Sequence, residues 1–170
     1  MVIGIDDLSS GKIDNIAKFI NNDKKNNFIF IRKNINQLTS KDLLGKKIDY
    51  TIHLAAMTSV TESIKFPKKF IEINENGFEK LILNLLKIKT LKKVIYASSA
   101  AVYGNSPSKN SEKSILKPLS PYAFSKINNE KKEKFYSKRS KIKFIGFRFF
   151  NIFGKNQNPR GEYSSVISKW

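Results

Sequence analysis

Cysteine is absent from the 170 residues, so neither disulfides nor thiolate chemistry can contribute to this protein. No apolar run approaches the roughly 18 residues that would suggest a membrane helix. The apolar opening at residues 1–5 passes at once into Asp6 and Asp7, which does not resemble a signal peptide. These absences predict a cytoplasmic protein that does not enter a membrane. Apolar residues still make up 40% of the chain, enough for the core of one domain.

Arginine is scarce although the chain is strongly basic. Only 4 of the 32 lysine and arginine residues are arginines, and the formal net charge is +18. Side chains that read nucleic-acid bases or clamp phosphates favour the arginine fork, and the lysines are spread along the whole sequence. We therefore expect solvated surface lysines and no nucleic-acid partner. A polyanion-binding surface is the alternative.

The middle of the sequence carries the clearest chemistry. Val94–Ala97 is a short, partly β-branched run typical of a buried strand, and it ends in Ser98 and Ser99. In open α/β sheets the carboxyl ends of the strands form the edge where ligands bind. Further on, Ser120 and Pro121 predict a helix start, with serine as the cap and proline at the first helical position.

Tyr122 and Lys126 follow at i and i+4, so both side chains leave one face of this helix. A phenol has an ordinary pKa of about 10, and a nearby ammonium group should lower it. The hydroxyl of Ser99 can hydrogen-bond the same substrate oxygen. We therefore predict that Ser99, Tyr122 and Lys126 form a proton-abstraction unit, with Ser99 and Tyr122 in contact with the substrate.

Several segments together resemble one known family. SSAAVYG directly after a strand, followed by SPYAFSK, is similar to the extended short-chain dehydrogenase/reductase superfamily, and specifically to its NAD-dependent nucleotide-sugar epimerase/dehydratase branch. HLAA at 53–56, INENG at 73–77 and RFFNIFG at 148–154 resemble further segments of that family, in the same order. The resemblance implies an α/β fold with a doubly wound, parallel Rossmann sheet, and NAD as cofactor.

The resemblance also implies the ligand contacts. Asp6 begins DDLSSG, similar to the family's DNLSTG; its carboxylate would accept hydrogen bonds from the adenosine ribose and repel a 2′-phosphate, which favours NAD over NADP. Asn34 stands where the family commonly has an aspartate near the adenine. The remaining implied cofactor contacts are Ile35, Leu54, Ala55, Ala56, Asn74, Ser98, Tyr122 and Lys126. For Asn74, a core-facing side chain is an equal alternative. Asn151 is implied to bind the substrate diphosphate.

The remaining pattern completes an alternation of strands and helices. It predicts strands at 2–5, 28–31, 49–54 and 142–147, and helices at 15–27, 40–44, 70–89 and 121–137, with a further helix start near 59–67. The single histidine, His53, lies inside an expected strand, and we predict that it packs or hydrogen-bonds there and does not catalyse. We expect no metal site.

A glycine-rich phosphate turn is missing from this pattern. A Rossmann sheet binds pyrophosphate on such a turn after its first strand, about 20 residues before the acidic residue; here that residue is Asp6, and the sequence contains no GxxGxxG. We therefore expect an internal fragment of a longer enzyme, inactive by itself. Residues 1–150 would form an incomplete NAD-binding domain and 151–170 the start of a sugar-nucleotide-binding region. The strand order 3-2-1-4-5-6 places the lost strand between two that remain.

The two residues after Ser99 narrow the reaction that the resemblance implies. Family dehydratases carry Asp-Glu there to eliminate water, whereas this chain carries Ala100 and Ala101, as 4-epimerases do. The implied function is NAD-dependent 4-epimerisation of a UDP-hexose or UDP-N-acetylhexosamine by transient oxidation, in a family whose full-length members are homodimers. The alternatives are another nucleotide-sugar dehydratase or reductase of this family, or a non-catalytic, basic remnant that binds polyanions.

Overall fold

The computed structural model describes residues 1–21, 27–43, 45–106 and 109–154. Along these residues strands alternate with helices: β1 (Val2–Asp6), α1 (Ala17–Asn21), β2 (Phe28–Arg32), α2 (Ser40–Leu43), β3 (Tyr50–His53), α3 (Val60–Lys65), α4 (Pro67–Phe70), α5 (Gly77–Leu85), β4 (Lys93–Ser99), α6 (Pro121–Ser137) and β5 (Lys143–Phe149). Short 3₁₀ turns lie at Ile13–Asn15, Ile35–Gln37 and Ala100–Tyr103, and a π-helical turn at Ile71–Asn76 joins α4 to α5. None of the described helices has the length and apolar character needed to cross a membrane.

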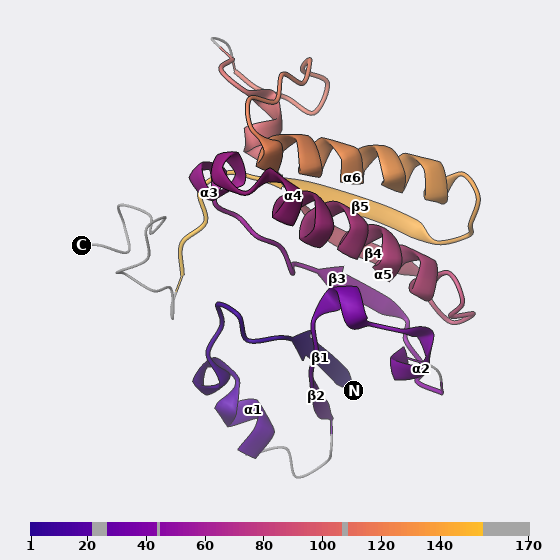
Figure 1. Ribbon diagram of the computed structural model, residues 1–170. Helices are drawn as coiled ribbons and strands as arrows, with labels where there is room; N and C mark the ends of the chain where they lie inside the picture. Colours follow the sequence, from indigo (N-terminus) through magenta and orange to yellow (C-terminus); the bar gives the residue numbers. More distant parts are fainter. Residues whose placement is uncertain (22–26, 44, 107–108, 155–170) are drawn as a thin grey trace.

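The strands form two separate parallel sheets, of order β1-β2 and β3-β4-β5. A doubly wound sheet has the order 3-2-1-4-5-6, and leaving out its first strand gives this arrangement. Figure 1 shows the β1–β2 pair apart from the larger sheet, with α4, α5 and α6 lying across one face of the latter. No strand joins β1 to β3 within the part of the chain that the structure describes. The predicted Rossmann-type fold without its first strand is confirmed.

The strands alternate between a helix-covered face and an open face. In β4 the side chains of Val94, Tyr96 and Ser98 are buried, while their neighbours are half-buried. The open face carries apolar side chains in register, since Ile52 of β3 and Ile145 of β5 both pair with Ile95 of β4. Ile52 is 66% exposed. Sheets of this kind bury both faces in complete α/β domains, so this face has the composition of an interior surface.

The core lies between the larger sheet and its helices. One cluster of buried side chains joins α2, α5 and the starts of β4 and β5, and a second joins α5 to β4; their members are Leu38, Leu43, Leu81, Leu85, Leu91, Val94 and Ile142, and Phe78, Ile82 and Tyr96. Full burial of one such side chain stabilises the fold by about 1.5–3 kcal/mol. This packing holds α5 and β4 together.

The ends of α6 agree with the sequence prediction. Ser120 caps the helix, because its Oγ accepts a hydrogen bond from the Ala123 backbone N–H at 3.1 Å, and Pro121 is the first helical residue. The helix ends at Ser137. The start of α6 is thereby fixed directly before Tyr122.

Two predicted helices differ from the structure. The helix expected at 70–89 ends at Leu85 and contains the π-helical turn Ile71–Asn76, because the side chain of Asn74 is used for internal hydrogen bonds. Apolar spacing does not reveal an extra residue in one turn. The helix expected at 15–27 is confirmed only over Ala17–Asn21, and residues 22–26 lie outside the described residues.

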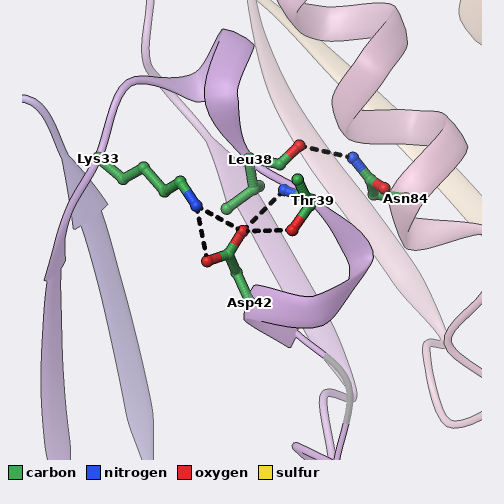
Figure 2. A network of polar contacts seen from close by, with 5 residues as sticks. All are labelled: Lys33, Leu38, Thr39, Asp42 and Asn84. Atoms are coloured by element: carbon green, nitrogen blue, oxygen red, sulfur yellow. Dashed lines mark hydrogen bonds and ion pairs between the residues drawn. The ribbon is translucent and has the colours of Figure 1, made fainter.

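Polar contacts tie the smaller sheet to the larger one, as Figure 2 shows. Lys33, directly after β2, binds both carboxylate oxygens of Asp42 in α2, at 2.8 and 2.9 Å. Hydrogen bonds from Lys33 and then from Thr39 lower the pKa of Asp42 to about 2. The Asn84 side chain of α5 donates to the carbonyl oxygen of Leu38 at 3.0 Å. The segment that connects β2 to α2 is therefore bound both by Lys33, next to the smaller sheet, and by Asn84 of α5.

Candidate active site

The predicted proton-abstraction unit assembles at the carboxyl end of β4. Ser99 ends this strand, and Tyr122 and Lys126 lie in the first two turns of α6. The two helical side chains are buried, with exposed fractions of 8% for Tyr122 and 3% for Lys126. Lys126 Nζ lies 5.7 Å from the centroid of the Tyr122 ring. The shared helix face that the i, i+4 spacing predicts is confirmed.

Lys126 is a buried amine with spare donors. Its Nζ donates to the carbonyl oxygen of Ala97 at 3.0 Å, and burial lowers its pKa to about 8. An ammonium group has three N–H donors, so the bond to Ala97 leaves two for a ligand. Near neutral pH most of this group still carries its charge.

The pKa of Tyr122 differs from our expectation. We expected the Lys126 ammonium to lower the pKa of Tyr122, but burial raises that pKa, and a hydrogen bond with Ser99 is what acts in the opposite direction. The ring packs edge-on against Phe70 at a centroid distance of 6.4 Å, which helps to explain the burial. Loss of water around the phenol outweighs the effect of Ser99, because desolvation disfavours phenolate.

The two serines at the end of β4 have different surroundings. Ser99 Oγ accepts a hydrogen bond from the Ala101 backbone N–H at 3.2 Å and so caps the following 3₁₀ turn. Ser98 points to the opposite face of the sheet, where its Oγ donates to Glu130 Oε1 at 2.6 Å. The Ser98 hydroxyl therefore has a partner within the protein, Glu130. That Ser98 contacts the cofactor stays a prediction.

Asn74 lies at the centre of the π-helical turn and is 1% exposed. Its side chain binds the backbone of Met57 twice, accepting from N–H and donating to C=O, both at 2.9 Å. It also donates to Ser125 Oγ at 3.3 Å. The structure therefore favours the core-facing alternative for Asn74. Through it the segment after β3, with Leu54, Ala55 and Ala56, is tied to α6.

The predicted adenosine contacts belong to the smaller sheet. Asp6 is exposed at the end of β1, and its Oδ1 accepts the Leu8 backbone N–H at 2.7 Å. Asn34 donates to Asp7 Oδ2 at 2.6 Å and accepts from the Asn36 backbone N–H at 2.9 Å, so it caps the next turn. Ile35, another predicted cofactor contact, is partly buried and packs against the larger core cluster.

The remaining predicted residues follow their strands. Leu54 is 62% exposed directly after β3, beside an exposed Ala55 and a half-buried Ala56. Asn151 is exposed two residues after β5. Most of the predicted sugar-nucleotide-binding region, residues 155–170, lies outside the described residues.

His53 has the surroundings of a packing residue. It is 7% exposed, and its ring lies 5.4 Å from that of Phe78. Burial, and secondly the charge of Lys126, lower the pKa of His53 to about 3. This neutral ring supports the predicted packing role. No group of three or more His, Cys, Asp or Glu residues that could hold a metal ion occurs in the described ranges.

Comparison with known families decides the classification. The model of the NAD dependent epimerase/dehydratase family matches residues 1–170, the whole chain. The chain belongs to this family. The resemblance inferred from SSAAVYG and SPYAFSK is thereby confirmed.

Individual proteins with epimerase or dehydratase names are similar over 80–99% of this chain. A dTDP-D-glucose 4,6-dehydratase of Dictyostelium discoideum is 40% identical over 80% of this chain and 34% of its own length. The structure of a UDP-N-acetylglucosamine 4-epimerase from Methanobrevibacter ruminantium M1 matches with a TM-score of 0.88 and 34% identity, over 99% of this chain and 53% of that one. A UDP-glucuronic acid 4-epimerase from Bacillus cereus, solved with UDP-glucuronic acid and NAD, matches with a TM-score of 0.81 and 29% identity, over 94% and 51%.

The chain spans about half or less of the length of the curated relatives it matches, between 34% and 52% for the first three. NAD is the cofactor of the family. The residues present fit two parts of it: the two remaining N–H groups of buried Lys126 fit a ribose diol, and the exposed carboxylate of Asp6 fits a second one. No glycine-rich turn for the pyrophosphate occurs in this sequence.

Two further residues near the site were not singled out from the sequence. Glu130 and Arg148 form a partly buried ion pair at 2.7 Å beside Ser98. Sequence spacing could have pointed to Glu130, because it follows Lys126 at i+4 and must share its helix face. That Arg148 would be its partner depends on the pairing of β5 with β4, which sequence spacing does not give.

Proposed function

We propose that this chain supplies the proton-transfer residues of an NAD-dependent 4-epimerase acting on a UDP-hexose or UDP-N-acetylhexosamine. The observation that carries the proposal is the grouping of Ser99, Tyr122 and buried Lys126 at one strand end. The epimerases among the similar structures support the proposal, since their names give UDP-sugars as substrates.

The residues have separate tasks in this proposal. Tyr122, as phenolate, takes the proton of the sugar hydroxyl and later returns it, while Ser99 hydrogen-bonds the same oxygen. Lys126, with two N–H groups to spare, would hold the nicotinamide ribose. NAD, when bound, supplies a reversible hydride acceptor. Asp6 would hold the adenosine ribose, and Asn151 the substrate diphosphate.

A dehydratase is the second candidate, because the Dictyostelium relative is 40% identical. Ala100 and Ala101 favour the epimerase. They begin the 3₁₀ turn after Ser99 and offer only methyl groups, whereas elimination of water needs an acid and a base. Formation of a 4-keto-6-deoxy sugar nucleotide would decide for the dehydratase.

Self-association is part of the proposal. Apolar side chains are exposed along α3, the π-helical turn and α6, namely Ile64, Phe66, Ile71 and Phe124. Such side chains mark contact surfaces, and we propose that a homodimer covers them. The cytoplasmic location stays a prediction. Salt-sensitive binding of nucleic acid by this chain, without any dependence on NAD, would instead favour the polyanion-binding alternative.

The direct test joins to this chain the segments that a 4-epimerase relative has on either side of the matched part, namely the glycine-rich strand–turn–helix and the rest of the sugar-binding region. With NAD and UDP-glucose, we expect UDP-galactose to form, as measured by chromatography. Tyr122→Phe should slow turnover by roughly 10²–10⁴-fold and leave NAD binding nearly unchanged. Normal turnover in this variant would contradict the role of Tyr122.

The 170-residue chain itself provides the control. NAD binding in this fold uses backbone N–H groups and the helix dipole at the glycine-rich turn, which this sequence does not contain. We expect isothermal titration of the chain alone to show no micromolar binding of NAD and no epimerisation. Micromolar binding would mean that another segment takes over the role of that turn.

A further inference from the structure

One carboxylate joins the elements that carry the candidate active site. Ser98 Oγ donates to Glu130 Oε1 at 2.6 Å, and Arg148 binds both oxygens of this carboxylate, from Nε at 2.9 Å and from Nη2 at 2.7 Å. Arg148 Nη1 also donates to the Tyr103 hydroxyl and to the Glu112 carbonyl oxygen, both at 3.2 Å. The network thus connects β4, the turn that follows it, α6 and β5.

The network is partly buried, and its ion pair is charged. The side chains of Arg148 and Glu130 are only 18% and 11% exposed. Burial would raise the pKa of Glu130, but hydrogen bonds from Arg148 and Ser98 outweigh it, so that the pKa is lowered. A buried ion pair adds little net stability compared with apolar side chains of the same volume. The two-pronged guanidinium contact does fix the direction of both side chains, which indicates a geometric role.

The same face of α6 binds two successive residues of β4. Tyr122, Lys126 and Glu130 follow one another at intervals of four and therefore share that face. Lys126 binds the carbonyl of Ala97 and Glu130 binds the hydroxyl of Ser98. The next residue of the strand is Ser99, whose hydroxyl acts to lower the pKa of Tyr122. Because adjacent strand residues face opposite sides, holding Ser98 sets the direction in which Ser99 points.

We propose that Glu130, oriented by Arg148, is a positioning residue that sets the register of α6 on β4 and so brings the Ser99 hydroxyl to the Tyr122 phenol. A misplacement of about 1 Å at such a site costs about 10²-fold in rate. The proposal rests on the proposed function for the identity of Tyr122 as the base. The register that it explains, of α6 on β4, is a property of the folded chain.

A second anchor of the same helix offers a matched control. Near the far end of α6, Tyr136 donates its hydroxyl to Glu79 Oε1 at 3.0 Å, and Lys132 binds the other oxygen at 2.7 Å. Ser98→Ala and Tyr136→Phe each remove one hydroxyl that donates to a glutamate holding α6. Arg148→Lys keeps the positive charge but removes the two-pronged guanidinium contact with Glu130. If the Glu130 network contributed to stability alone, Ser98→Ala and Tyr136→Phe would affect Tyr122 to a similar extent.

The experiment uses the whole 170-residue chain labelled with [¹³Cζ]tyrosine, with the Tyr122 resonance assigned from Tyr122→Phe. This carbon reports hydrogen bonding at the phenol. We expect Ser98→Ala and Arg148→Lys to shift the Tyr122 signal toward that of Ser99→Ala, and Tyr136→Phe to leave it in place. If Arg148→Lys does not fold, the comparison of Ser98→Ala with Tyr136→Phe decides.

Two results would overturn the positioning role: an unchanged Tyr122 signal in folded Ser98→Ala, or an equal shift in Tyr136→Phe, which would mean general loosening of the helix. Neither result touches the proposed function, because the signal does not depend on turnover. Conversely, normal turnover of Tyr122→Phe in the joined chain would refute the base and leave the measured register intact.

Discussion

In the three-stranded sheet every second residue from Val94 to Ser98 is buried, whereas β1 and β2 contain no buried residue. The larger sheet is held to α5 and α6 by core side chains and by the Glu130 network. The smaller pair depends on partial burial of Ile5 and on the polar contacts of Figure 2. The proposed proton-transfer residues therefore lie on the well-packed scaffold. Asp6, the predicted ligand of the cofactor ribose, lies on the loosely packed one.

The largest expected difference between the two sheets is in stability. Phe78 is fully buried, so Phe78→Ala should lower the free energy of unfolding by about 3–5 kcal/mol. Ile5 is only partly buried, and Ile5→Ala should cost about 1–2 kcal/mol. Urea denaturation followed by circular dichroism measures both. Equal losses would show that the smaller sheet is packed as tightly as the larger one.

Acid should act on the larger sheet through His53. Its pKa of about 3 lies below the ordinary 6.5, so the stability it provides is present above pH 6.5 and is lost as the pH falls toward 3. The slope is at most about 1.4 kcal/mol per pH unit for one proton. In His53→Phe the unfolding free energy should depend less on pH in this window. An unchanged slope would assign acid sensitivity to other groups.

The smaller sheet should influence cofactor choice more than rate. In the joined chain, Asp6→Asn removes a negative charge that would face the 2′-phosphate of NADP. Since two charges about 4 Å apart in water interact by about 1 kcal/mol, the NAD/NADP affinity ratio should fall by about fivefold, and further with a basic residue introduced nearby. Asp14→Asn is the matched control. An unchanged ratio would leave Asp6 with only its bond to the Leu8 backbone.

The smallest effect is expected where the two sheets are tied together. The pKa of Asp42 is about 2 in place of 3.8, so its contribution is present above pH 3.8 and is lost as the pH falls through 2. Asp42→Asn should therefore melt slightly earlier than the parent chain at pH 7, and the gap should close in acid. Calorimetry at several pH values would test this. A gap that widened in acid would contradict the assignment of the low pKa to Asp42.

Local patterns predicted most of this fold. The strand after Lys93 and the capped start at Ser120 follow from short-range chemistry, and both are confirmed. The sequence could not reveal which of two adjacent serines faces the helix, because that depends on the pairing of β4 with its neighbours. The raised pKa of Tyr122 was missed for a similar reason: burial by Phe70 is a long-range contact.

The π-helical turn marks a place where the length of this helix can change. Each residue of an α-helix turns the chain by about 100°, since 3.6 residues complete a turn. Phe70 and Phe78 are both fully buried, and with one residue deleted between Ile71 and Asn76 they would lie about 20° apart around a plain helix. Such a deletion should therefore keep both rings facing the interior, but it would remove the turn that carries Asn74 to the backbone of Met57.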